Sequence, residues 1–333
     1  MNLNLLKDLC DISAVSGNEE NLRDFIASKI RDHVSGINVD ALGNLIVKKN
    51  GKNNDEENSK RIVLTANMDE PGLIISHITD GGFLKFGTVG KVCSKALLGT
   101  RVLVGKNNLP GVVGSTPVHL LKEDSKYKEV LVKDMYIDIG AKSKEDAKKY
   151  INLGDYVCFL SDFIQNENII IARALSSKIA CFLLINLIKK EYKKDIYLAF
   201  TTNGNTNFAG AKTMAYSLSP DLAIVLSAVC ANESYPRLQD GPVLPFMEPC
   251  TIHSKGLYNE VLDLANKNNV PIQTTKSNIK TSASVISKTK NGVQTVNLAF
   301  PCKYIHSPLE MCSSLDLENT ERLLDYLVIN LVQ

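Results

Sequence analysis

Apolar residues recur along the chain with two alternating periodicities. Helical spacing marks residues 4–13 and 18–34, and the second segment opens with Asn18, a residue type that caps helices. Nearly continuous apolar runs predict strands at 43–50 and 61–68. Strands that are apolar throughout and alternate with helices are typical of a sheet covered by helices on both faces.

The same alternation returns in the carboxyl-terminal half of the chain. Helices are predicted at 175–192, 205–218, 255–269 and 319–332, and strands at 196–201, 222–229 and 293–300. The stretch from Phe200 to Leu218 reads as a strand end, a polar turn, and a helix beginning near Asn205. In open α/β sheets ligands bind at the carboxyl ends of the strands, so we expect a functional site at this turn.

A β-rich block separates the two α/β segments. Short runs rich in Val and Ile, broken by glycine, predict a small barrel or sandwich. One helix, Ser143–Ile151, lies within the block, and Asp146 follows Ser143 at the spacing of a capping box. We therefore expect a discontinuous α/β domain over residues 1–68 and 166–333, with a β-rich domain inserted at 69–165.

Composition and charge exclude several classes of partner. Hydrophobic residues make up 44% and charged residues 22% of the chain, as in ordinary globular proteins with a full core. A formal net charge of +2 gives no electrostatic reason to expect nucleic acid or an acidic membrane surface. The start is a poor signal peptide, and no apolar run has the length of a membrane span. The eight cysteines form no C-x-x-C pair, so we expect mostly buried free thiols and a cytoplasmic location.

Five segments, in a consistent order, carry a resemblance to a known family. They are "SAVSGNEENLRDFI", "VDALGNLIVKK", "GVVGSTPVHLL", "MYIDIGAKSKEDA" and "KYIHSPLE". The whole chain resembles the dinuclear-metal aminopeptidases, which include the glutamyl and tetrahedral aminopeptidases and members described as cellulase or endoglucanase M. The resemblance implies a zinc-aminopeptidase-like α/β fold, a mixed sheet with helices on both faces, and an inserted small β-barrel that mediates dimerisation. It also implies two divalent metal ions, zinc or cobalt, in the α/β domain.

The residues that the resemblance assigns to the two metal ions are mostly neutral in this chain. Asn67, in "ANMDE", stands where the family has a ligand histidine, although Asp69, which orients that histidine in the family, is retained. Ser176, in "RALSSK", replaces the bridging aspartate. Gly204 and Asn205 replace the glutamates that act as general base and as ligand. A glycine has no side chain with which to take a proton from water.

Two further carboxylates of the family pattern are missing, and one ligand is retained. Ser227, in "VLS", replaces a ligand aspartate, and Ser282, in "KTSAS", replaces an aspartate near the substrate; His306, in "YIHSP", is retained. Two divalent ions ~3.5–4 Å apart repel each other by roughly 20 kcal/mol at an effective dielectric constant of about 20, so anionic ligands must offset the repulsion. Neutral hydroxyls and amides are poor zinc ligands. We therefore predict that the chain holds no pair of metal ions and does not hydrolyse peptides.

The remaining residues leave alternatives open. A weak single-metal site is conceivable from His306 with Asp69 and Asn67, and a serine hydrolase from His306 with one of the serines 176, 177 and 227. No G-x-S-x-G elbow supports a serine nucleophile, so we interpret the serines as small polar side chains in the space of former carboxylates. His306 itself is expected to make backbone contacts in a tight turn.

The sequence thus predicts a pseudoenzyme, a non-catalytic homologue of a dinuclear metallo-aminopeptidase. We expect self-association through 69–165, at least to a dimer, and a metal-free cleft for a small peptide-like or sugar-like ligand. The expected lining is Asn67, Asp69, Ser176, Asn205, Ser227, Ser282 and His306, with Gly204 at the position of the general base. Other roles left open are co-assembly with an active homologue, residual metal-dependent aminopeptidase activity, and another hydrolase activity in the same cleft.

Overall fold

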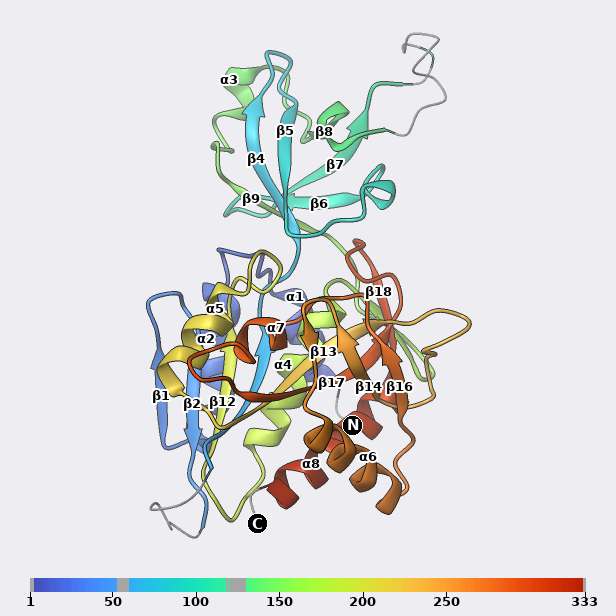
Figure 1. Ribbon diagram of the computed structural model, residues 1–333. Coiled ribbons are helices and arrows are strands. Elements are labelled where there is room, and N and C mark those ends of the chain that lie inside the picture. Colours follow the sequence, from blue (N-terminus) through green and yellow to red (C-terminus); the bar gives the residue numbers. More distant parts are fainter. Residues whose placement is uncertain (1–2, 53–59, 118, 120–129, 332–333) are drawn as a thin grey trace.

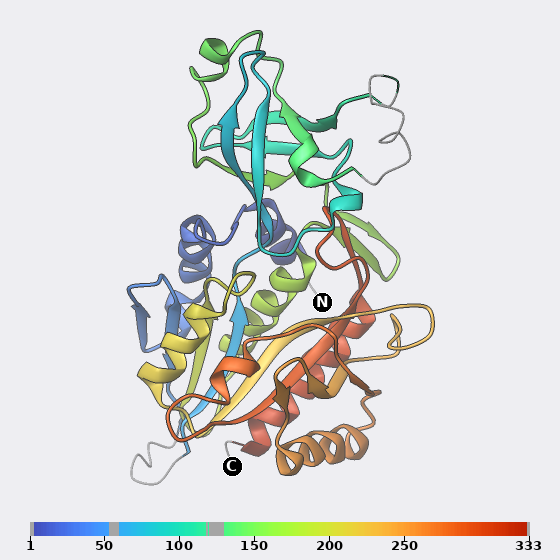
Figure 2. The ribbon, with the colours of Figure 1, turned by 45° about the horizontal axis from the view of Figure 1, so that its top comes forward.

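The computed structural model of the protein describes residues 3–52, 60–117, 119 and 130–331. It has a larger α/β part and a smaller β-barrel, which lies at one end of the molecule (Figures 1 and 2). The predicted fold class, a mixed sheet between helices with a small inserted barrel, is confirmed.

The larger sheet is mixed, with a parallel centre. Within the described residues it has nine strands in the order β1-β2-β12-β3-β13-β17-β14-β15, with β16 paired to β14. They are β1 (Gly36–Val39), β2 (Leu45–Lys49), β3 (Ile62–Asn67), β12 (Ile196–Thr201), β13 (Leu222–Cys230), β14 (Val243–Glu248), β15 (Thr251–Ile252), β16 (Gln273–Lys276) and β17 (Gln294–Cys302). Because β12, β3, β13 and β17 are parallel, their carboxyl ends lie at one edge of the sheet.

Helices cover both faces of this sheet because successive side chains of a strand point to opposite faces. Leu64 and Leu226 belong to the large core shared with helices α1, α2, α4, α6 and α8. Val63 and Val225 belong to a smaller core shared with α5 and α7 on the other face. The helices are α1 (Asn4–Asp11), α2 (Glu20–Ile30), α4 (Leu175–Ile188), α5 (Ala209–Leu218), α6 (Lys255–Lys267), α7 (Ala283–Ile286) and α8 (Ser314–Leu331).

The chain leaves the larger sheet after β3 and forms a closed barrel with the strand order β4-β5-β8-β7-β6-β9. Its elements are β4 (Gly72–Ile78), β5 (Leu84–Val89), η2 (Ser94–Ala96), β6 (Arg101–Val104), β7 (Leu109–Ser115), η5 (Val132–Asp134), β8 (Met135–Asp138), α3 (Lys144–Ala147) and β9 (Tyr156–Phe159). The Ser143 hydroxyl accepts a hydrogen bond from the Asp146 backbone N–H at 3.2 Å, which confirms the predicted cap. A small sheet of β10 (Ile164–Asn166), β11 (Ile169–Ala172) and β18 (Glu310–Ser313) follows.

Several element boundaries differ from the sequence-based expectations. The helix expected near Asn205 begins at Ala209, because the backbone amides of residues 204 and 205 donate to Asp69 instead of opening a helix. Asn18 does not cap α2, whose N-cap residue is Glu19. The closing helix begins earlier than expected, at Ser314.

None of the helices in the described parts of the chain is both long enough and apolar enough to span a membrane. All eight cysteines are free thiols, of which Cys93, Cys230 and Cys250 are exposed and the others buried.

Candidate ligand-binding cleft

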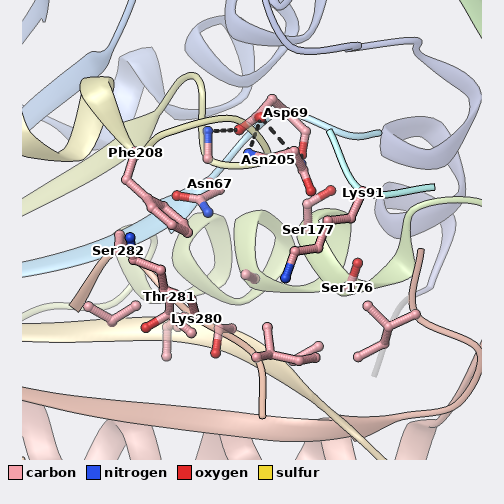
Figure 3. A pocket seen from close by; sticks show the side chains of 18 of the residues that line it. Asn67, Asp69, Lys91, Ser176, Ser177, Asn205, Phe208, Lys280, Thr281 and Ser282 are labelled. Carbon is pink, nitrogen blue, oxygen red and sulfur yellow. Dashed lines mark hydrogen bonds between the residues drawn. The ribbon is translucent and has the colours of Figure 1, made fainter. Parts of the chain in front are cut away.

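A pocket of about 180 Å³ lies at the carboxyl-terminal edge of the larger sheet, between the ends of β3 and β13 and the loop that follows β12 (Figure 3). The structure brings every residue proposed from the sequence to its wall: Asn67, Asp69, Ser176, Gly204, Asn205, Ser227, Ser282 and His306. Further lining residues include Lys91, Phe208, Lys280 and Thr281, none of which the sequence analysis had selected.

Asp69 is fully buried and holds the loop after β12 (Figure 3). One carboxylate oxygen accepts from the Gly204 N–H at 2.7 Å, and the other accepts from the Asn205 N–H at 2.7 Å and from the Ser16 hydroxyl at 2.5 Å. The Asn205 side chain donates to the same carboxylate at 3.2 Å. Burial raises the pKa of Asp69, while these hydrogen bonds oppose the rise. The aspartate that orients an imidazole in the related family therefore organises a backbone loop here.

The space beside Gly204 is filled by a neighbouring side chain. The Asn67 amide oxygen accepts from the Thr201 hydroxyl at 2.9 Å, which fixes the amide at the end of β3. A β-carbon added at Gly204 would lie 2.2 Å from Asn67 Nδ2, 2.3 Å from its Cγ and 2.8 Å from its Cβ. Real β-carbons do not make such contacts, so the present arrangement has no room for a side chain at position 204.

The amino end of α4 is occupied by a carboxylate of the protein itself. Glu310 is 1% exposed and accepts from the Ser176 N–H at 2.6 Å, the Ser176 hydroxyl at 3.1 Å and the His306 N–H at 3.1 Å. A negative charge is favourable at a helix amino end, where backbone N–H groups are otherwise unpaired. Burial raises the pKa of Glu310 to about 7, and the hydrogen bonds from Ser176 and His306 oppose the rise. Glu310 is the last residue of the segment "KYIHSPLE", but the sequence did not single it out.

A series of hydrogen-bonded polar side chains supports the opposite wall of the pocket, which is formed by β13 and the segment before α7. The Ser227 hydroxyl donates to Asn297 Oδ1 at 2.8 Å, and Asn297 Nδ2 donates to Glu248 at 3.1 Å. The Thr281 hydroxyl donates to the other Glu248 oxygen at 2.5 Å. The Ser227 and Thr281 protons are thus committed to acceptors behind the pocket.

The donor set does not fit two divalent ions. The described residues contain no group of three or more His, Cys, Asp or Glu side chains placed to hold a metal ion. A single site built on His306, Asp69 and Asn67 meets a further obstacle, since the oxygens of Asp69 and Asn67 already accept hydrogen bonds. No reaction step through a metal can be derived from this arrangement.

The serines do not form a nucleophile and base pair with His306. The Ser176 hydroxyl donates to Glu310, the Ser177 hydroxyl donates to the Ala174 carbonyl at 3.2 Å, and Ser227 donates to an amide. None of the hydrogen bonds in the described part of the chain joins a serine to the His306 imidazole. The His306 backbone has a positive φ of 71° and donates to Glu310, consistent with the expected tight turn.

Two lysines enter the cleft from opposite sides. Lys91 follows β5 and Lys280 precedes α7, and Figure 3 shows Lys91 on one side and Lys280, Thr281 and Ser282 on the other. Gly90, the residue before Lys91, packs against the loop after β12, since a β-carbon at Gly90 would be 2.9 Å from Asn205 Cβ. Lys91 therefore lies close to this loop. Burial and the positive charge of Lys91 lower the pKa of His306. Lys280 is the first residue of the segment "KTSAS", and a lysine two residues before Ser282 is the signal that could have identified it.

Comparisons with known proteins agree with the fold. Residues 43–323 match the family described as M42 glutamyl aminopeptidase. A candidate aminopeptidase of Acetivibrio thermocellus is 36% identical, over 96% of each chain. The structure of a TET aminopeptidase from a marine-sediment Thaumarchaeota archaeon superposes with a TM-score of 0.93 at 29% identity, covering 98% of this chain and 96% of that one. The Pyrococcus horikoshii TET1 peptidase, described as assembling into a tetrahedron or a large octahedral shell, gives a TM-score of 0.88 at 33% identity, covering 98% and 99%.

Proposed function

We propose that this chain, which belongs to the M42 glutamyl aminopeptidase family, is a non-catalytic member of that family. In this proposal it is a pseudoenzyme with a metal-free cleft. The observation that carries the proposal is the general-base position. There Gly204 offers no side chain, and the Asn67 amide occupies the space that a side chain would need. Loss of the base removes the group that would take a proton from the attacking water.

The composition of the cleft supports a binding role. Its wall combines amide and hydroxyl groups with apolar side chains, among them Phe208 and Leu226, in a concave pocket. Pockets of this composition hold small ligands through a few convergent polar contacts. The proposed ligand is peptide-like or sugar-like and is bound without turnover.

Self-association is the second part of the proposal. Structures similar to this chain include assemblies described as a dodecamer and as a tetrahedron. We assign self-association, at least to a dimer, to the inserted domain at 69–165, with the α/β domain formed by residues 1–68 and 166–333. Co-assembly with an active homologue is a further role that this architecture would support.

A peptide-substrate panel with added zinc or cobalt tests the proposal directly. We expect no hydrolysis above the rate without protein, because the cleft has neither a general base nor a set of anionic metal ligands. The Pyrococcus horikoshii TET1 peptidase, assayed on the same peptides, shows whether the panel detects activity. Metal-dependent release of amino-terminal residues by this chain would contradict the proposal and favour a residual aminopeptidase.

A further inference from the structure

We propose that the cleft binds an oxyanion, the carboxylate or phosphate group of a compact organic ligand, between Lys91 and Lys280. This inference rests on the proposed function, because two divalent ions in the same pocket would repel both ammonium groups. It specifies the chemical class of the ligand, which the fold and the family do not assign.

The charge available to a ligand in this pocket is positive. Among the described lining residues Asp69 is the one acid, and it is fully buried with both oxygens engaged by the Gly204–Asn205 loop and Ser16. Within the described chain, neither Lys91 nor Lys280 has a carboxylate at ion-pair distance. Both lysine side chains are exposed and line the same pocket, and two positive charges at one pocket favour an anion.

Neutral donors without partners complete the site. Thr201 donates to the Asn67 amide oxygen, and Asn67 Nδ2 has no acceptor among the described residues. Ser282 is 1% exposed, lines the pocket, and its hydroxyl makes no hydrogen bond to any described residue. Both residues line the pocket, so the two donors are available to the oxygens of an anionic ligand.

The rest of the pocket limits the size and polarity of the ligand. The Lys280 ammonium lies 5.5 Å from the centroid of the Phe208 ring, a cation–π contact that holds it near the cleft. Val225, Leu226 and Ile305 add apolar surface to a volume of about 180 Å³. The pocket therefore suits one anionic group attached to a short neutral or apolar body.

Calorimetric titration with matched probes tests this inference, in buffer free of phosphate and at low salt. The probes are inorganic phosphate, glycerol 3-phosphate against glycerol, and N-acetylalanine against N-acetylalanine amide. We expect phosphate and at least one of the two anionic compounds to bind, with the neutral partner of each pair at least tenfold weaker. The two pairs separate a phosphate-bearing from a carboxylate-bearing ligand.

Lysine substitutions identify the site. We expect Lys91→Ala and Lys280→Ala each to weaken binding at least tenfold, and the double variant to abolish it. Lys95→Ala and Lys276→Ala remove nearby exposed lysines that do not line the pocket and are expected to leave binding unchanged. Unchanged melting temperatures would show that all variants are folded.

The outcomes separate this inference from the proposed function on which it rests. Equal binding of charged and neutral probes, or full binding by the double lysine variant, overturns the inference. Absence of anion binding in a protein that holds no metal also overturns it, while the pseudoenzyme proposal stands. Two bound metal ions per chain would overturn both.

Discussion

Gly204→Glu, which places a glutamate where the resemblance to the family assigns the general base, is expected to lower the free energy of unfolding by about 4 kcal/mol and to produce no peptide hydrolysis. The new β-carbon would lie within 2.8 Å of three Asn67 atoms, so either the loop or the end of β3 must move. Overpacking of this kind costs roughly 1–3 kcal/mol, and a second carboxylate beside buried Asp69 adds to the loss. Urea unfolding measures the change.

A double-mutant cycle with Asn67→Gly shows whether the predicted contact is the cause. Asn67→Gly removes the three atoms nearest to the new β-carbon, so Gly204→Glu should cost about 2 kcal/mol less in that background. Gly256→Glu is the matched control, since a β-carbon there meets nothing within 4 Å, and its effect should stay below about 1 kcal/mol. If Gly204→Glu lowers the free energy of unfolding equally with Asn67 and with Asn67→Gly, the contact with Asn67 is not the cause of the loss.

The free energy of unfolding is expected to fall by about 3 kcal/mol between pH 4.5 and pH 7 through Glu310 alone. Burial raises the pKa of this carboxyl from 4.5 to about 7 in the folded chain. Between these values the unfolded chain has released the proton and the folded chain retains it, so a rise in pH favours unfolding. The stability that Glu310 contributes is complete below pH 4.5 and is lost as the pH rises through 7.

Glu310→Gln isolates this contribution because glutamine does not titrate. Urea unfolding of both proteins from pH 4 to pH 8 gives the difference in free energy, in which other buried carboxyls, such as Asp316 with a pKa raised to about 6, cancel. The difference should change by about 3 kcal/mol in favour of the variant as the pH rises. A difference that is independent of pH would show that Glu310 is not protonated in the folded chain at neutral pH.

Much of the fold could be predicted from the pattern of apolar residues. Nearly continuous apolar runs alternate with segments of helical periodicity, and these runs identified β3, β12, β13 and β17. The runs are apolar because parallel strands buried on both faces contain few polar residues. The strands β14, β16 and β18 were not recognised. β16 and β18 have four residues each, too few to show a period, and Pro245 interrupts the apolar run of β14.

The candidate site was predictable in its membership but not in its internal contacts. Family motifs placed Asn67, Gly204 and Ser227 in one cleft, and all three line the pocket in the structure. The sequence could not show that Asp69 binds the backbone of the loop after β12, because that contact depends on the path of the loop. Lys91 was also missed, since it reaches the cleft from the segment after β5 in the barrel.

Loss of the acidic ligands and the new contacts form one consistent arrangement. Without metal ions, several carboxylates in one cleft would repel each other and raise each other's pKa. In this chain neutral side chains stand at those positions, Asp69 is satisfied by backbone amides, and Glu310 is placed at the helix amino end. The carboxylates of Asp69 and Glu310 are thus paired with hydrogen-bond donors in place of metal ions.

The metal content of the native protein tests the central claim most directly. Protein purified without chelator from cells supplied with zinc and cobalt should contain close to no divalent metal per chain by elemental analysis. A content near two zinc or cobalt atoms per chain would contradict the account.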